Sequence, residues 1–122
     1  FTPLRLLVLG GSAGLLRWVV MGIAPELPVL VIIQTLHGVT FAATHLGAMR
    51  FIVEKLPVEV SARAQGLYSA ISLGLIMGGG LFVSGYLYEA FASGAYFVMA
   101  GLCAGALLIG LYLRLSTNKL LH

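Results

Sequence analysis

One apolar run, Val29–Val53, is long enough to cross a lipid bilayer, yet polar side chains recur along it. At about 100° per residue, these side chains fall within or beside one sector of a helix roughly 80° wide. The members of this polar face are Gln34, His37, Thr40, Thr44 and His45. An unpaired polar group in hydrocarbon is unfavourable by several kilocalories per mole, so such a face usually borders other helices or an aqueous pathway. We predict that this helix lines a transport route.

The composition of the chain is that of an integral membrane protein. Of its 122 residues 60% are hydrophobic and 9% are charged, whereas about a quarter of the residues of a soluble domain are charged. The seven Lys and Arg residues are scattered and have no interleaved aromatic residues, so no nucleic-acid partner is expected. The single Cys103 excludes an internal disulfide and a cysteine-based metal site, and we expect no cofactor.

Turn and loop signals divide the apolar sequence into separate spans. Pro25 and Pro28 flank an acidic residue and predict a tight turn. The charged sequence around Pro57 predicts a loop outside the lipid, and Ser61 is the predicted N-cap of the next helix. We therefore predict an all-α membrane protein, one domain with four transmembrane helices over about residues 4–24, 29–53, 62–88 and 95–113.

Small and polar residues predict where the helices meet. The third span has a polar face followed by glycines, which favours close helix packing or a bend. The members of this predicted helix interface are Gln65, Tyr68, Ser69, Ser72, Gly74 and Gly78. The spacing of Gly10 and Gly14 in the first span lets another backbone approach closely. The glycines of the fourth span, Gly101, Gly105 and Gly110, predict a smooth packing face.

The positions of Lys and Arg predict how the chain is oriented in the membrane. Positive residues lie near both ends of the sequence and around the loop Glu54–Arg63, whereas the turns at 25–28 and 89–94 have none. The positive-inside rule then predicts that both termini and this loop are cytoplasmic. Because the sequence begins at Phe1, without a charged leader before an apolar core, we expect a piece of a longer protein whose N-terminal helices are its partners in the bilayer.

Arg17 lies inside the first span, where a central arginine is unfavourable by about 2.5–3.5 kcal/mol. If the first two spans form a hairpin about the proline turn, residues whose numbers sum to about 53 lie at equal depth. Arg17 is then level with His37, and we expect both to belong to a substrate and proton-coupling site together with the rest of the polar face. The alternative is that Arg17 extends to the membrane interface.

The two histidines of the polar face differ in their expected roles. His37 and His45 are two turns apart, roughly 12 Å by helix rise, so they cannot chelate one metal ion and no metal site is expected. For His37 we favour a functional role, because histidine changes charge near neutral pH. For His45 a site role and a hydrogen bond between helices both remain open. With no carboxylate inside any span and no nucleophile–base set, the chain is not expected to be an enzyme.

Several segments resemble one known family of transporters. They are LLRWVVMG, VIIQTLHGVTFAATHLGAMRFI and QGLYSAISLGLIMGGGLFVSGYLYE. The pattern resembles helices nine to twelve of a major facilitator superfamily transporter, and within it the phenylpropionate permease and lactose permease group of proton symporters. In that group an Arg on the ninth helix and a His on the tenth belong to the substrate and proton-coupling site, and they match Arg17 and His37. One turn after that histidine, where the sugar transporters have a carboxylate, this sequence has Thr40.

The resemblance implies an architecture and a function. The tenth helix lines the central cavity, the eleventh packs where two six-helix halves meet, and the ninth and twelfth are peripheral. Such transporters rock two halves about a midplane site. The chain would then be the C-terminal part of a secondary active transporter in the bacterial inner (plasma) membrane, which moves a small organic solute, an organic acid or a sugar-like compound, by symport with protons.

Two alternatives stay open. The first is a complete four-helix transporter that dimerises, as small multidrug exporters do, although those depend on an acidic residue in the first helix, where this chain has Arg17. The second is a non-transporting membrane scaffold whose polar face holds helices together.

Overall fold

The computed structural model describes residues 2–23 and 25–120, and the secondary structure in this part of the chain is helical throughout. The elements in order are α1 (Pro3–Gly22), α2 (Leu27–Lys55), α3 (Val58–Ser69), the π-helical segment η1 (Ala70–Ile76), α4 (Met77–Phe91), the 3₁₀ turn η2 (Ala92–Gly94) and α5 (Ala95–Leu120). The predicted all-α fold is confirmed. The expected end of the first span, Ala24, lies outside the described residues.

Prolines define where the helices begin. Pro3 occupies the first turn of α1, where its missing N–H is not needed, and the Thr2 hydroxyl accepts a hydrogen bond from the Arg5 N–H (3.4 Å). Pro28 is the second residue of α2 and also lies in the first turn. These two helices therefore start where the sequence removes a backbone donor that would otherwise be unsatisfied.

The start of α3 differs from the prediction. Pro57, not Ser61, is the N-cap residue, and the Ser61 N–H already donates to the Pro57 carbonyl (3.0 Å). Proline fixes φ near the helical value, so the helix can begin at the residue that follows it. The predicted N-cap at Ser61 is wrong by one turn, and the Ser61 hydroxyl instead accepts a hydrogen bond from Gln65 Nε2 (3.2 Å).

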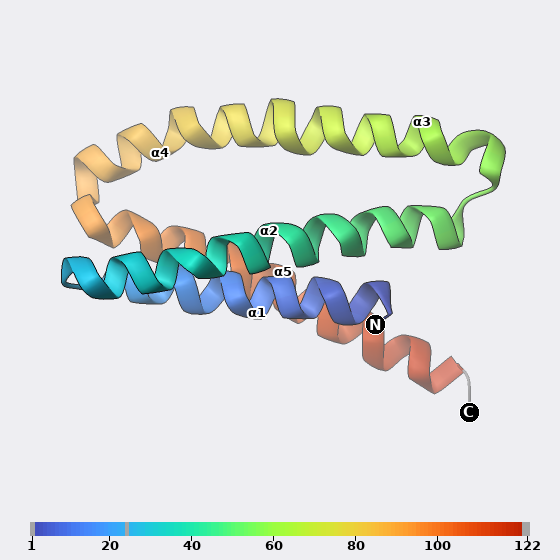
Figure 1. Ribbon diagram of the computed structural model, residues 1–122, viewed down its shortest axis with the longest axis horizontal. Helices are drawn as coiled ribbons and strands as arrows, with labels where there is room; N and C mark the ends of the chain where they lie inside the picture. The colour runs from blue at the N-terminus through green and yellow to red at the C-terminus, as the bar shows by residue number, and fades with distance from the viewer. Residues whose placement is uncertain (1, 24, 121–122) are drawn as a thin grey trace.

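The apolar helices are long enough to cross a membrane. Three stretches qualify by length and hydropathy, Pro3–Gly22, Leu27–Lys55 and Val58–Thr117, with mean hydropathies of 1.5, 1.6 and 2.0. The third is 60 residues long and turns back at η2, where Ala92 has a positive φ of 50°. Its two halves, α3–η1–α4 and α5, run in opposite directions (Figure 1), and each is long enough to span a bilayer.

Helix α1 packs between α2 and α5 (Figure 1). A Cβ added to Gly10 would clash with the Thr44 hydroxyl oxygen of α2, and one added to Gly14 would lie 3.3 Å from Cγ2 of Thr40. Towards α5, a Cβ at Gly22 would come within 2.7 Å of the Phe97 ring. The close approach expected at Gly10 and Gly14 is therefore present.

The packed face of α5 is not the face that its glycines suggest. Gly101 and Gly105 have nothing within 4 Å of an added Cβ. In contrast, Ala100 is buried, and Leu107 would lie 3.7 Å from a Cβ added to Gly11 of α1. The glycines lie about a third of a turn away from this packed face. Within this chain Gly101 and Gly105 therefore make no close helix contact, whereas a Cβ at Gly110 would lie 3.6 Å from Val8.

The helix formed by α3, η1 and α4 approaches the other helices chiefly near its two ends. Helix α3 contacts α2 close to the turn at Pro57, and α4 contacts α5 close to η2. Figure 1 shows its middle separated from α2. The pocket described next lies between these helices, and side chains from α1, α2, α3, η1 and α4 line it.

Candidate functional site

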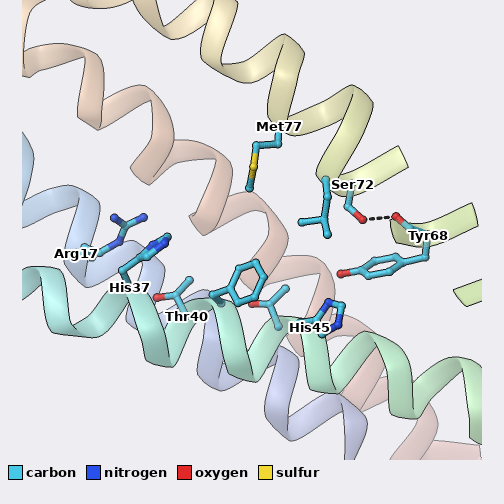
Figure 2. A pocket seen from close by; sticks show the side chains of 10 residues that line it. Arg17, His37, Thr40, His45, Tyr68, Ser72 and Met77 are labelled. Carbon is cyan, nitrogen blue, oxygen red and sulfur yellow. Dashed lines mark hydrogen bonds between the residues drawn. The ribbon is translucent and has the colours of Figure 1, made fainter. Parts of the chain in front are cut away.

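A pocket of about 240 Å³ lies between the polar face of α2 and the helix that runs from α3 through η1 to α4. Helix α1 contributes Arg17, and α2 contributes His37, Thr40, Phe41, Thr44 and His45. The opposite side is formed by Tyr68, Ser72, Leu73 and Met77. In Figure 2, Arg17 and His37 lie towards one end of the pocket, and His45 and Tyr68 lie towards the other.

The structure thus brings five of the six expected site residues to one pocket. These are Arg17, His37, Thr40, Thr44 and His45. The sixth, Gln34, does not line the pocket but binds Arg17. The helical spacing of three and four residues places the α2 members on one face, and the α1–α2 hairpin places Arg17 beside that face.

Arg17 is buried, with 7% of its surface exposed. Its Nη1 donates a hydrogen bond to Oε1 of Gln34 (3.3 Å), and its guanidinium carbon lies 3.9 Å from the centre of the Trp18 ring. The Trp18 ring in turn stacks on Tyr96 of α5, with 5.8 Å between ring centres. Arg17 is therefore oriented towards α2 instead of extending along its own helix towards the membrane interface.

The guanidinium retains hydrogen-bonding capacity. Its Nε is buried and has no hydrogen-bond partner among the described residues. A guanidinium carries five N–H donors in a planar fork, which matches a carboxylate well. A charged group held in this way at the edge of a pocket can bind an anionic ligand.

Aromatic rings connect the two histidines along α2. The rings of Phe41 and His45 stack nearly parallel, at 5.8 Å and 4°, and the His37 ring lies 6.5 Å from Phe41. His45 also lies 6.1 Å from the ring of Tyr68, across the pocket on α3. His45 therefore helps to join α2 to α3, whereas His37 lies at the end of the pocket where Arg17 is found.

Thr40 has its hydroxyl hydrogen engaged within α2. Its Oγ1 donates to the carbonyl oxygen of Leu36 (2.9 Å), as threonines in helices often do. The oxygen can still accept a hydrogen bond from a ligand, but it cannot replace the carboxylate of the sugar transporters as a proton carrier.

The expected helix-interface residues of α3 and η1 have several different environments. Tyr68 and Ser72 line the pocket, and Gln65 binds Ser61 on its own helix. Gly74 and Gly78 have nothing within 4 Å of an added Cβ, so they make no close helix contact within this chain. Ser69 is half-buried and does not line the pocket.

Sequence reasoning missed the apolar side of the pocket. Leu73 and Met77 line it, but in an apolar helix they look like any lipid-facing residue. The role of Trp18 as a support for Arg17 was also missed. The sequence signal for this role was that Trp18 directly follows Arg17, because arginine commonly stacks on tryptophan.

The described residues contain no group of three or more His, Cys, Asp or Glu side chains that could hold a metal ion. What the site offers is a fixed cation, two imidazoles and an apolar wall. It can bind a small molecule through hydrogen bonds, charge and apolar contact.

The fold and the site define an integral membrane protein in which apolar helices border a pocket with a buried arginine at its edge. The profile of the MFS_1 like family matches residues 1–99, and the chain belongs to this family. The resemblance to the major facilitator superfamily is confirmed.

One relative has a name that states a transport function. The probable 3-phenylpropionic acid transporter of Escherichia coli (strain K12) is 37% identical to this chain over 95 residues, which are 78% of this chain and 25% of that protein. The chain thus spans about a quarter of the length of this relative. No solved structure matches the chain with significance.

Proposed function

We propose that this chain is the C-terminal part of a secondary transporter that carries a small organic acid together with protons across the bacterial inner membrane by alternating access. The observation that carries the proposal is Arg17, which is buried and points to a pocket with no carboxylate among its lining residues. A substrate carboxylate would supply the missing counter-charge.

The lining of the pocket suits a substrate with one charged end and one apolar end. Arg17 and His37 provide the polar end, and Phe41, Leu73 and Met77 provide aromatic and aliphatic surface. A pocket that is mostly apolar with a few fixed polar groups is typical of small-molecule sites. The name of the Escherichia coli relative, a probable 3-phenylpropionic acid transporter, describes a substrate of this shape.

The arrangement of the helices is compatible with alternating access. The helix from Val58 to Phe91 approaches α2 near one end only, so the width of the pocket depends on the angle between these helices. Rocking of one bundle against another about a midplane site would change that angle. Symport would require a group that binds and releases a proton during the cycle, and His37 is the candidate on this chain.

Uptake of labelled 3-phenylpropionic acid by the intact transporter that contains this segment tests the proposal. Replacement of Arg17 by Lys keeps the charge but removes the planar fork, and we expect the apparent affinity to fall about tenfold. Arg114→Lys is the matched control, because Arg114 lies near the end of α5 and does not line the pocket.

Uptake by the wild type that requires an inward proton gradient, falls in Arg17→Lys and stays unchanged in Arg114→Lys would support the proposal. A wild type that inserts normally but takes up no organic acid would contradict it and favour the scaffold alternative.

A further inference from the structure

The partner of Arg17 is a neutral amide and not a carboxylate. Its Nη1 donates to Oε1 of Gln34 at 3.3 Å. The ion pair found in the described part of the chain joins Arg50 and Glu54, near the end of α2. The positive charge of Arg17 is therefore oriented by a neighbour that does not neutralise it.

The identity of residue 34 decides how much charge the pocket presents. A carboxylate at this position would form a charge-assisted hydrogen bond with Arg17, and in a low-dielectric site this bond would cancel most of its attraction for a second anion. The amide of Gln34 keeps the geometry of the bond and leaves the charge available. Trp18 supports the guanidinium from its face, so orientation does not depend on an anionic partner.

We propose that Gln34 is a positioning residue that sets the charge selectivity of the pocket: it orients Arg17 without neutralising it, so that the site prefers a substrate with one carboxylate over its neutral analogue. This inference rests on the proposed transport of an organic acid. It adds that selectivity is determined by a side chain that does not itself line the pocket.

The test compares two probes of nearly equal shape, 3-phenylpropionic acid and its neutral amide, in the intact transporter. The measured quantity is the ratio of their apparent affinities, obtained from uptake of the acid and from competition by the amide. Gln34→Glu keeps the shape of the side chain and adds a negative charge. We expect this variant to lose about tenfold or more of the preference for the acid, while its affinity for the amide stays within a few-fold of the wild type.

Two further variants separate charge from position. Gln34→Met is also neutral but cannot accept the Arg17 hydrogen bond, so it should keep the preference for the acid and bind both probes more weakly. Gln65→Glu is the matched control: it makes the same substitution on α3, where Gln65 binds Ser61 and does not line the pocket, and it should leave the affinity ratio unchanged.

Each outcome decides a different question. A wild type that does not take up 3-phenylpropionic acid would overturn the proposed function and this inference with it. A wild type that takes up the acid while Gln34→Glu retains the full preference would overturn the inference alone. If Gln34→Glu does not accumulate in the membrane, Gln34→Met still decides, because wild-type affinities for both probes in that variant would show that Gln34 does not position Arg17.

Discussion

At the scale of single residues, His37 is the side chain of this pocket that we expect to link transport to pH. It lines the pocket at the same end as Arg17 (Figure 2), and an imidazole ring can both accept and donate a proton. Glutamine can donate and accept hydrogen bonds but cannot change its charge. We therefore expect His37→Gln to insert normally and to flatten the pH dependence of uptake, or to lower the substrate affinity.

His45→Gln provides the comparison for this prediction. His45 packs between Phe41 and Tyr68, so its replacement should weaken the contact between α2 and α3 and lower the thermal stability more than it alters the pH profile. An unchanged rate, affinity and pH profile in His37→Gln would show that His37 only helps to hold helices together.

The depth of the site residues could be predicted from the sequence, because a short proline turn fixes the register of the hairpin that it closes. The sequence predicted that the numbers of two residues at equal depth in this hairpin sum to about 53. The close approach of Gly14 to Thr40 and of Gly10 to Thr44 agrees with this register. The hydrogen bond between Arg17 and Gln34 follows from the same register. The support by Trp18 and Tyr96 could not be predicted, because it depends on how α5 packs against α1.

At the scale of helical elements, the contact between α1 and α2 depends on the absence of a side chain at Gly10. An added Cβ would lie 3.1 Å from the backbone nitrogen of Thr44 and closer still to its hydroxyl oxygen, so the helices would have to separate. We expect Gly10→Ala to destabilise the intact protein by about 1–3 kcal/mol, as overpacked core sites usually do. Thermal unfolding in detergent measures this loss.

The adjacent glycine is the control for that variant. A Cβ at Gly11 would meet Leu107 of α5 at an ordinary distance of 3.7 Å, so Gly11→Ala should be tolerated. Equal destabilisation by both substitutions would mean that any side chain in this part of α1 is harmful and that the close contact with Thr44 is not the cause.

The π-helical segment η1 could not be predicted from sequence, although a bend or a close contact near the glycines was expected. The Ser72 hydroxyl donates to the Tyr68 carbonyl, where it competes with the backbone N–H that would bind there in an α-helix. Gly74 lies within η1 and its added Cβ would meet nothing. Whether such a helix widens or stays regular depends on a small energy difference that residue patterns do not encode.

At the scale of the whole molecule, the charged residues are divided between two ends. The start of α1, the turn between α2 and α3 and the end of α5 lie at one end, and the turns before α2 and at η2 lie at the other (Figure 1). Except for Arg17, the Lys and Arg residues are near the first end, and Glu26 and Glu89 are near the second. By the positive-inside rule, this separation predicts that the first end lies in the cytoplasm.

Cysteine labelling of the intact protein in whole cells tests this orientation. In an otherwise cysteine-free background, Glu26→Cys lies at the start of α2 and should react with an impermeant thiol reagent added outside. Glu59→Cys, in the first turn of α3, should react only after the membrane is permeabilised. Both positions follow a proline-containing turn and are exposed, so a difference in labelling reports the side of the membrane and not burial. The opposite pattern would invert the predicted topology.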